Sequence, residues 1–379
     1  MRKTDISLFL DNFKEGGVQR AILNLARGLI ELNFEVDIVV YKKTGPFLKQ
    51  LPEGIKVVDL GNPRLRSSIP TLAKYLQREQ PRALIASLHY STEIAILAKL
   101  YSQAHTKVAV CEQGAFLALP SVQPSLKNLA YLLGLTPSNP KTLVRFLYPF
   151  ADKVVGVSNG VCEDLAVLIG NNPTKLHTIY NPVITPELIA KAKEPVEHPW
   201  LQPNQIPVIL ATGRLEAQKD FPTLIQAFAQ VRKLKPARLM ILGTGSQRPQ
   251  LEELIRQLNL EADVALPGFV DNPYAYMSKS AVFVLSSIWE GLGNVLIEAM
   301  AAGVPVVSTN CKSGPDEILA YGKYGDLVPV GNIQEIAEAI LRVLSGQIKS
   351  VDSDWLEQFM IKPVARRYLE ILDLSAPSA

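Results

Sequence analysis

The feature of this sequence that most constrains its fold is an alternation, repeated along the chain, between short apolar runs and stretches of helical periodicity. The first expected strand, residues 6–10, precedes a loop with Gly16 and Gly17, and apolar residues then recur at helical spacing up to Leu32. Further strands are expected at residues 36–41, 55–60, 83–88, 107–111, 154–158 and 176–180. Such an alternation predicts an α/β fold with doubly wound parallel sheets.

The alternation stops between Pro182 and Pro207, a stretch with six prolines, and then begins again. Beyond it we expect strands at 208–212, 239–242, 264–266, 282–285 and 305–308, and helices at 221–235, 250–258 and 294–302. A chain of 379 residues has room for two domains. The prediction is two Rossmann-like domains, 1–182 and 207–354, joined by a linker, 183–206, and followed by a helical segment, 355–379, for which packing on the first domain is one arrangement.

Composition excludes several other classes of protein. With 47% hydrophobic and 20% charged residues the chain has the composition of a globular protein. The three cysteines, Cys111, Cys162 and Cys311, are scattered and odd in number, so no disulfide framework or zinc spacing is expected. No apolar run is long enough for a membrane helix or a secretory signal, and a cytoplasmic location fits best.

The charge is distributed unevenly between the two halves. Residues 1–181 contain 21 basic and 14 acidic side chains, whereas the remainder contains 18 and 22. The basic half could face an anionic lipid surface or a diphosphate, or the asymmetry could be a chance surface distribution. No basic run interleaved with aromatic residues is present, so nucleic-acid binding is not expected.

The segment from Ser286 to Pro305 carries the strongest chemical signal. An expected strand ends there in a polar loop containing Gly291 and Gly293, and a helix is expected to begin at Asn294. The free backbone N–H groups at a helix start bind phosphate oxygens, and glycines let a ligand approach the backbone. Carboxylates would repel a phosphate there, so Glu290 and Glu298 are expected to accept hydrogen bonds from sugar hydroxyls.

Two cations complement this helix start. The expected strand 208–212 ends in Gly213 and Arg214, and Lys219 follows five residues later. Both cations should lie at the carboxyl edge of the same sheet. An arginine fork and a lysine point charge can together neutralise a diphosphate without a metal ion.

These motifs together resemble glycosyltransferase family 4, whose members are retaining enzymes of the GT-B fold. The resemblance rests on Gly213-Arg214 with Lys219, the Glu-x7-Glu pair Glu290 and Glu298, Gly16-Gly17 with Arg20, and Tyr180-Asn181-Pro182. The segments Asn272-Pro273-Tyr274, Ser286-Ser287 and Ser313 to Leu319 are similar to a subgroup that transfers hexoses or N-acetylhexosamines to lipid-linked or polysaccharide acceptors.

The resemblance implies a role for each matching residue. Arg214, Lys219, Glu290 and His89 would be catalytic: the two cations would stabilise the departing nucleotide, and the other two would contact the donor sugar. The donor nucleotide sugar would also contact Gly16, Gly17, Gly213, Gly243, Phe269, Val270, Gly291, Leu292, Gly293, Asn294, Val295 and Glu298. Leu292 stands where the family often has phenylalanine. No metal and no cofactor are implied.

Three weaker sequence signals each allow two interpretations. Gly243 and Gly245 form either a tight turn or part of the nucleotide site. Asp352-Ser353-Asp354 has the form of a metal-binding Asp-x-Asp, although a helix cap explains it more easily. Residues 125–150 mix apolar and basic side chains, which suits a helix resting on anionic lipid, but an ordinary core helix shows much of the same pattern.

The sequence therefore predicts a cytoplasmic retaining glycosyltransferase, peripheral on the membrane, that uses a nucleoside diphosphate sugar, with UDP favoured, and a lipid-linked or polysaccharide acceptor. A front-face mechanism is implied, in which a leaving phosphate oxygen takes the acceptor proton. The alternatives are a non-catalytic sugar-nucleotide-binding assembly protein and a sugar-nucleotide epimerase.

Overall fold

A computed structural model describes residues 4–14, 16–61, 67–114, 140–203 and 205–375. Its contacts divide the chain into two compact units. The first unit comprises Met1–Pro182 with Phe359–Ala379, and the second comprises Val183–Gln358. Each unit is built on one parallel sheet, which confirms the predicted α/β class.

The first unit contains a sheet of seven strands in the order β3-β2-β1-β4-β5-β6-β7, with every neighbouring pair parallel. The strands are β1 (Ile6–Leu10), β2 (Val36–Val40), β3 (Lys56–Asp59), β4 (Ala83–Ser87), β5 (Lys107–Glu112), β6 (Lys153–Gly156) and β7 (Leu176–Thr178). All seven expected strands are present. The central strands β1, β2 and β4 are buried along their whole length, as parallel strands covered on both faces should be.

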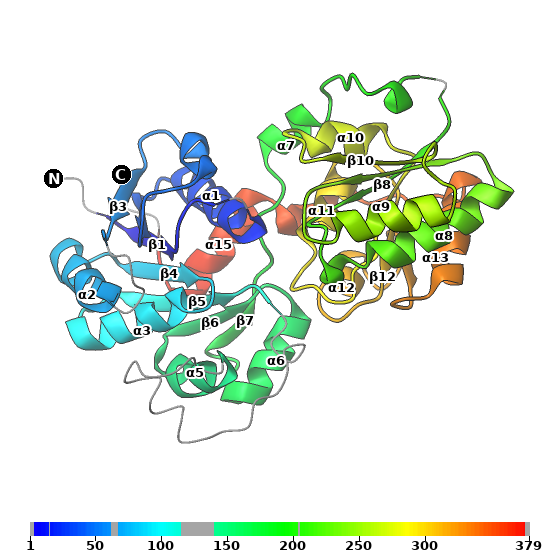
Figure 1. Cartoon of the computed structure of the whole chain (residues 1–379). Coiled ribbons are helices and arrows are strands. Elements are labelled where there is room, and N and C mark those ends of the chain that lie inside the picture. Colours follow the sequence, from blue (N-terminus) through cyan, green and yellow to red (C-terminus); the bar gives the residue numbers. More distant parts are fainter. Residues whose placement is uncertain (1–3, 15, 62–66, 115–139, 204, 376–379) are drawn as a thin grey trace. The chain divides into compact units, whose positions relative to one another are not determined.

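Helices cover this first sheet. They are α1 (Gly17–Ile30), α2 (Ser68–Glu79), α3 (Ser91–Ser102), α5 (Pro140–Leu147), α6 (Asn159–Ile169) and α15 (Ile361–Ile371), with the 3-10 turns η1 (Pro46–Gln50) and η4 (Tyr148–Phe150). Figure 1 shows α2 beside α3, and α15, in red, beside α1. Gly28 makes the second contact possible, because a Cβ there would lie 2.5 Å from the Ile361 carbonyl oxygen.

The second unit has a sheet of six strands in the order β10-β9-β8-β11-β12-β13, again all parallel. The strands are β8 (Val208–Thr212), β9 (Arg238–Leu242), β10 (Val264–Gly268), β11 (Val282–Leu285), β12 (Val306–Thr309) and β13 (Asp326–Val328). The bounds of β8 and β11 are those expected from the sequence. The short strand β13 was not predicted, because its three residues owe their extended form to pairing with β12.

The helices of the second unit are α7 (Pro186–Lys191), α8 (Phe221–Leu234), α9 (Arg248–Gln257), α10 (Pro273–Lys279), α11 (Asn294–Ala301), α12 (Pro315–Ile318), α13 (Ile333–Leu344) and α14 (Ser353–Leu356). The 3-10 turns are η5 (Pro199–Leu201), η6 (Ala217–Lys219) and η7 (Glu357–Phe359), which spans the boundary between the units. Residues 183–203, within the segment read as a linker, belong to the second unit, where α7 contacts α10 and α11. None of the helices that the structure describes is long and apolar enough to cross a membrane.

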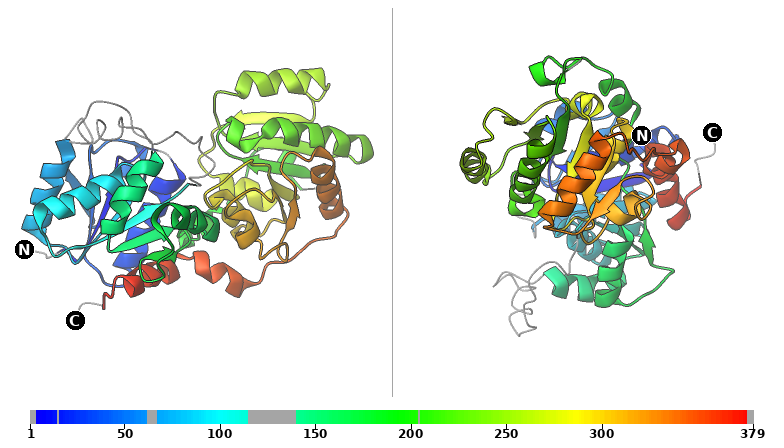
Figure 2. Two further views of the ribbon diagram at one scale, coloured as in Figure 1. Left: turned by 90° about the horizontal axis from the view of Figure 1, so that it is seen from below. Right: turned by 90° about the vertical axis from the view of Figure 1, so that its right-hand side faces the viewer.

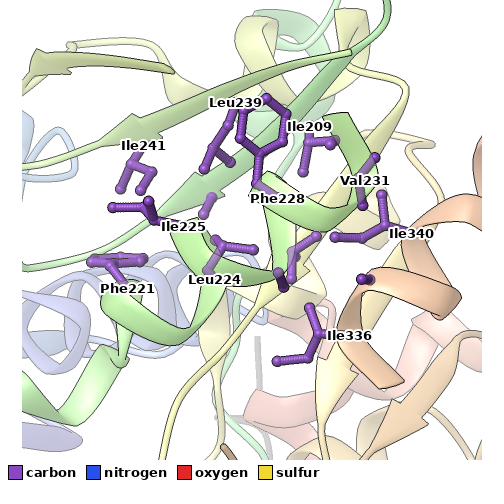
Figure 3. Close-up of a cluster of buried hydrophobic side chains, with 14 of the residues drawn as sticks. Ile209, Phe221, Leu224, Ile225, Phe228, Val231, Leu239, Ile241, Ile336 and Ile340 are labelled. Atoms are coloured by element: carbon purple, nitrogen blue, oxygen red, sulfur yellow. The ribbon is translucent and has the colours of Figure 1, made fainter. Parts of the chain in front are cut away.

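A buried apolar cluster holds α8 against the second sheet. Figure 3 shows Phe228 of α8 lying against Ile209 and Leu239 of the sheet, with Ile336 and Ile340 approaching from α13. The views in Figure 2 show α13, in orange, beside the green α8. Because α8 is fixed in this way, the loop that joins it to β8 has a defined place at the carboxyl edge of the sheet.

Both sheets reverse their winding direction once. The chain winds outward from β1 toward β3 and then crosses to β4, and in the same way it crosses from β10 to β11 beside β8. Open α/β sheets bind ligands at such a switch point, in the crevice beyond the carboxyl ends of the two strands. In the second unit, the loops after β8 and β11 therefore form the expected site.

Candidate functional site

An ion pair joins the two loops at the switch point of the second sheet. The Lys219 Nζ lies 2.5 Å from Glu290 Oε1, and the two side chains are 13% and 9% exposed. Ser287 donates a second hydrogen bond of 2.7 Å to the same oxygen. Both contacts are made to Oε1, so Oε2 is the oxygen that can accept from a ligand hydroxyl.

Backbone contacts between the loops hold this pair in register. The Ile288 N–H donates to the Gln218 carbonyl at 2.8 Å, and the Gln218 amide donates back to the Trp289 carbonyl at 2.8 Å. Ser286 Oγ donates to the Lys219 carbonyl at 2.7 Å. The two charged residues are 71 positions apart in sequence, and these reciprocal bonds make their meeting a property of the fold.

Thr309 and Cys311 lie next to the loop that carries Ser287 and Glu290. Thr309, at the end of β12, donates to the Ser287 carbonyl at 2.6 Å, which ties the loop to the neighbouring strand. Cys311 lies close by and is 2% exposed. Burial, with the nearby Glu290 charge, raises the pKa of the Cys311 thiol to about 12, so this residue is not a thiolate nucleophile.

Glycines allow the loops after β8 and β9 to touch backbone to backbone. A Cβ on Gly243 would lie 1.9 Å from the Gly213 carbonyl oxygen, and the φ of +133° at Gly243 is itself unfavourable for other residues. A Cβ on Gly213 would meet the Lys219 side chain at 3.0 Å. The Gly243-x-Gly245 signal thus has a packing reason, and Arg214 stands exposed beside it at the edge of the sheet.

The helix α11 begins where the sequence predicted. Gly293 takes a left-handed conformation (φ 94°) at the position before the first helical residue, Asn294. Asn294 and Val295 are half-buried, so the first turn is accessible at one side. Glu298 is buried in the next turn, 9% exposed. The loop after β12 closes over this start, since a Cβ on Gly314 would lie 1.9 Å from the Leu292 carbonyl oxygen.

Buried polar atoms without a hydrogen-bond partner gather at this same edge. Within the described part of the second unit they include Thr212 Oγ1, at the end of β8, Gln247 Oε1, before α9, and Ser313 Oγ, after β12. A buried polar atom without a partner is costly and calls for an explanation, of which the binding of a polar ligand at this edge is one. The sequence analysis did not single out Thr212 or Gln247, nor the hydrogen bond of Ser287, because no local pattern marks them.

The remaining predicted residues of this unit lie around the same edge. Phe269 and Val270 follow β10, and the Phe269 ring is 58% exposed. Gly291 and Leu292 lie in the loop before α11, and Leu292 is buried at 3% exposure.

Asp352, in the Asp-x-Asp segment, accepts hydrogen bonds from Tyr324 and Lys323 instead of capping a helix. Across the described residues, no group of three or more His, Cys, Asp or Glu side chains is placed to hold a metal ion.

Three predicted residues belong to the first unit. Gly16 and Gly17 lie at the start of α1, after β1, with Gly16 in an extended conformation (φ 171°). His89 lies after β4, on the other side of the switch point, with its ring 20% exposed. The structure places all three at the carboxyl edge of the first sheet, and their roles stay predictions. Residues 125–139 of the segment considered for lipid contact lie outside the described residues.

Comparisons with known proteins agree with this geometry. The family model for glycosyl transferases group 1 matches residues 193–354, and that for glycosyltransferase family 4 matches residues 15–186. The chain is 29% identical over 349 residues to N-acetylgalactosamine-N,N'-diacetylbacillosaminyl-diphospho-undecaprenol 4-alpha-N-acetylgalactosaminyltransferase of Campylobacter jejuni, with 89% of this chain and 90% of that protein covered.

Solved structures show the same fold. The apo form of the lipopolysaccharide outer core galactosyltransferase WaaB matches with a TM-score of 0.73 and 19% identity, covering 98% of this chain and 99% of that one. The HepE protein of Anabaena in complex with UDP-glucose matches with a TM-score of 0.75 and 18% identity, covering 97% and 99%.

Proposed function

The chain belongs to the family 4 glycosyltransferases of the GT-B fold, and we propose that it transfers a hexose or N-acetylhexosamine from a UDP sugar to a lipid-linked or polysaccharide acceptor. The donor proposal is supported by the likeness to HepE, whose structure holds UDP-glucose. The acceptor proposal is supported by the Campylobacter relative, whose name specifies a diphospho-undecaprenol-linked saccharide.

The observation that carries the proposal is the group formed by Lys219, Glu290 and Ser287 beside the start of α11. A cation 2.5 Å from a buried carboxylate can turn toward a donor diphosphate while the carboxylate accepts from sugar hydroxyls. The positive end of the α11 helix dipole favours the same phosphates. A nucleotide sugar satisfies all three kinds of group at once.

In the proposed mechanism, Arg214 and Lys219 stabilise the charge that develops on the departing UDP. Preorganised cations of this kind act without a metal ion, so transfer is expected to continue in the presence of a chelator. The anomeric configuration is retained, with the acceptor hydroxyl attacking from the side that the nucleotide leaves. The acceptor proton passes to a leaving phosphate oxygen, so that no separate carboxylate base is required.

A cytoplasmic, peripheral location on an anionic membrane is part of the proposal. Phe146 at the end of α5 and Phe150 in η4 are 63% and 56% exposed, and Lys141 and Arg145 lie on the same short helix. Aromatic side chains next to basic ones suit the interface of an anionic bilayer. Flotation with vesicles of anionic and of neutral lipid tests this part: binding to the anionic vesicles alone is expected, and equal recovery without vesicles would contradict it.

The transfer reaction is tested by incubating the protein with radiolabelled UDP sugars and a panel of polyprenyl-diphosphate-linked saccharides, with and without EDTA. We expect label in the lipid fraction and its loss in Glu290→Ala. The matched control is Glu338→Ala, which removes an exposed carboxylate from α13. Donor binding without transfer to any acceptor would favour a non-catalytic assembly protein. Conversion of the donor sugar without an acceptor would indicate an epimerase.

A further inference from the structure

A second cluster of polar side chains lies in the first unit, at the carboxyl edge of its sheet. It contains His89, Thr92, Glu93, Glu112 and Tyr148, which come from the loop after β4, the first turn of α3, the end of β5 and η4. Glu93 and Glu112 are each 3% exposed, and Thr92 and Tyr148 are fully buried. Two carboxyl groups in such a place need an explanation beyond packing, since buried charges are costly.

The backbone around His89 is strained. Leu88 and Tyr90, the residues on either side of it, have positive φ angles of 79° and 73°, which are unusual for bulky residues. The Tyr90 and His89 rings lie 4.3 Å apart, and Tyr90 directly precedes α3. Strain of this kind costs free energy and persists where the fold holds a side chain in a required place. Here that side chain is His89.

A continuous chain of contacts leads from His89 into the interior. The His89 Nδ1 lies 2.8 Å from Glu93 Oε1, and Thr92 Oγ1 lies 3.2 Å from Glu93 Oε2. The Tyr148 hydroxyl lies 3.0 Å from Thr92 Oγ1 and also hydrogen-bonds Glu112 Oε1. One imidazole and two hydroxyl groups therefore connect two buried carboxyls.

The hydroxyls of Thr92 and Tyr148 can donate their protons in two orders. Each hydroxyl has one proton to donate. If Thr92 donates to Glu93, its oxygen accepts the Tyr148 proton, and Tyr148 must then accept a proton from Glu112. Thr92 also lies 3.4 Å from the Leu88 carbonyl, but the Glu93 carboxylate is nearer and, when charged, the stronger acceptor. The reverse order, in which Tyr148 donates to Glu112, would place the proton on Glu93 instead.

The surroundings decide which carboxyl carries that proton. Burial, together with the negative charge of Glu93, raises the pKa of Glu112 well above its usual value, which favours its protonated form. Glu93 lies in the first turn of α3 and faces the imidazole. The His89 Nδ1 and Glu93 Oε1 atoms lie within ion-pair distance but are not aligned as a hydrogen bond in the structure. Because a carboxylate can only accept, a ring that turns into line with Glu93 carries its proton on Nδ1.

We propose that Glu93 is a positioning residue that holds the His89 imidazole in one tautomer and one orientation, and that Glu112 supports it through Tyr148 and Thr92. The proposal rests on the proposed function in one respect, that His89 takes part in the transfer reaction, as the family resemblance implies. Glu93 itself is buried and acts only through His89.

The first test reads the tautomer directly and needs no activity. In protein labelled with 15N-histidine, with the His89 signal identified by its loss in His89→Gln, neutral His89 should carry its proton on Nδ1. Glu93→Ala should release the ring to the Nε2–H form, whereas the control Glu79→Ala, at the end of α2, should leave it unchanged. In infrared spectra, a carboxylic acid C=O band should disappear in Glu112→Gln and persist in Glu79→Gln.

The second test asks whether Glu93 acts through His89. Glu93→Ala should lower kcat by about 100-fold, the scale of a misplaced catalytic group, and change the donor KM by less than about threefold. The double variant His89→Ala, Glu93→Ala should be no slower than His89→Ala alone. Glu93→Gln keeps the side-chain volume and one acceptor, so it should recover part of kcat. It replaces Glu93→Ala in this test if the alanine variant does not fold.

Losses that multiply in the double variant, or a His89 tautomer unchanged in Glu93→Ala, would overturn the proposal. An unaltered kcat in Glu93→Ala, with transfer intact in the wild type, would also overturn it and leave the proposed function standing. If the wild type transfers no sugar while the His89 tautomer depends on Glu93, the proposed function fails and the pairing is supported.

Discussion

The two units share one strand order around the switch point, yet they treat buried carboxyl groups in opposite ways. In the second unit, Glu290 keeps its charge balanced by the Lys219 ammonium 2.5 Å away. In the first unit, Glu93 and Glu112 are linked through the hydroxyls of Thr92 and Tyr148, and burial raises the pKa of Glu112. The sheet thus determines where a site lies, while the loops beyond the strands determine its chemistry.

The loops differ in their backbone as well. The second unit uses Gly243 and Gly314, at positions where any Cβ would overlap a carbonyl oxygen. The first unit places bulky residues, Leu88 and Tyr90, in the same unfavourable region of φ. Both devices occur in each unit, since Gly45 in the first unit also approaches a carbonyl oxygen and Ser313 in the second also has a positive φ. What distinguishes the first site is that two such residues flank one side chain, His89.

The largest effect is expected from Lys219→Ala. This change removes the cation from the donor site and leaves a buried carboxylate unpaired, so transfer should fall by about 10³-fold, as when an electrostatic group at a transition state is lost. The measurement is kcat/KM with a UDP sugar. The protein should stay folded with lower stability. Lys233→Ala, an exposed lysine on α8, is the control, and equal activity of the two variants would break the contrast between the units.

Gly243→Ala should destabilise the second unit more than Gly303→Ala. Both glycines have positive φ, +133° and +82°, but a Cβ at Gly303 meets nothing within 4 Å, whereas one at Gly243 would lie 1.9 Å from a carbonyl oxygen. Conformational strain alone costs about 1–2 kcal/mol, and the clash should bring the total to about 3 kcal/mol. Urea unfolding measures both, and equal losses would show that close approach is not required.

Glu112→Gln should change how stability depends on pH. The pKa of Glu112 is raised in the folded protein, so its stabilising contribution is present below its ordinary value of 4.5 and is lost as pH rises toward the raised value. The free energy of unfolding of the wild type should therefore fall relative to Glu112→Gln, by at most about 1.4 kcal/mol per pH unit.

Glu79→Gln is the matched control for this measurement. Although burial opposes it, the hydrogen bonds and charges of Arg78 and Lys56 lower the pKa of Glu79. Its contribution is then present above the ordinary value and is lost as pH falls through the lowered one. The pH trend should have the opposite sign, and the same sign in both variants would refute the assignment of a neutral Glu112.

A smaller effect is expected from Ser287→Ala, which removes one of two hydrogen bonds to Glu290 Oε1 and leaves the Lys219 contact in place. A hydrogen bond to a charged group contributes about 1.5–3 kcal/mol, so kcat/KM should fall by at least about tenfold. The control is Ser353→Ala, which removes an exposed hydroxyl at the start of α14. Unchanged activity in Ser287→Ala would mean that Lys219 alone orients Glu290.

Much of this arrangement could be predicted from sequence. The strands β8 and β11 had clear apolar patterns, and the carboxyl ends of neighbouring parallel strands share one edge, so Arg214, Lys219 and Glu290 could be assigned to one site. The helix α13 was missed, although Asn332 accepts from the Glu335 N–H in a recognisable cap. The hydrogen-bonded contacts from Glu93 to Glu112 could not be predicted from the sequence, because they depend on side-chain contacts between three separate segments.

Calorimetric titration of UDP into the wild type, Lys219→Ala and Lys233→Ala tests the central claim most directly, since it asks whether the second unit grips a diphosphate through Lys219. The account predicts saturable binding to the wild type and to Lys233→Ala, with affinity weakened at least tenfold in Lys219→Ala, about 1.4 kcal/mol. Equal affinity in all three proteins would contradict it.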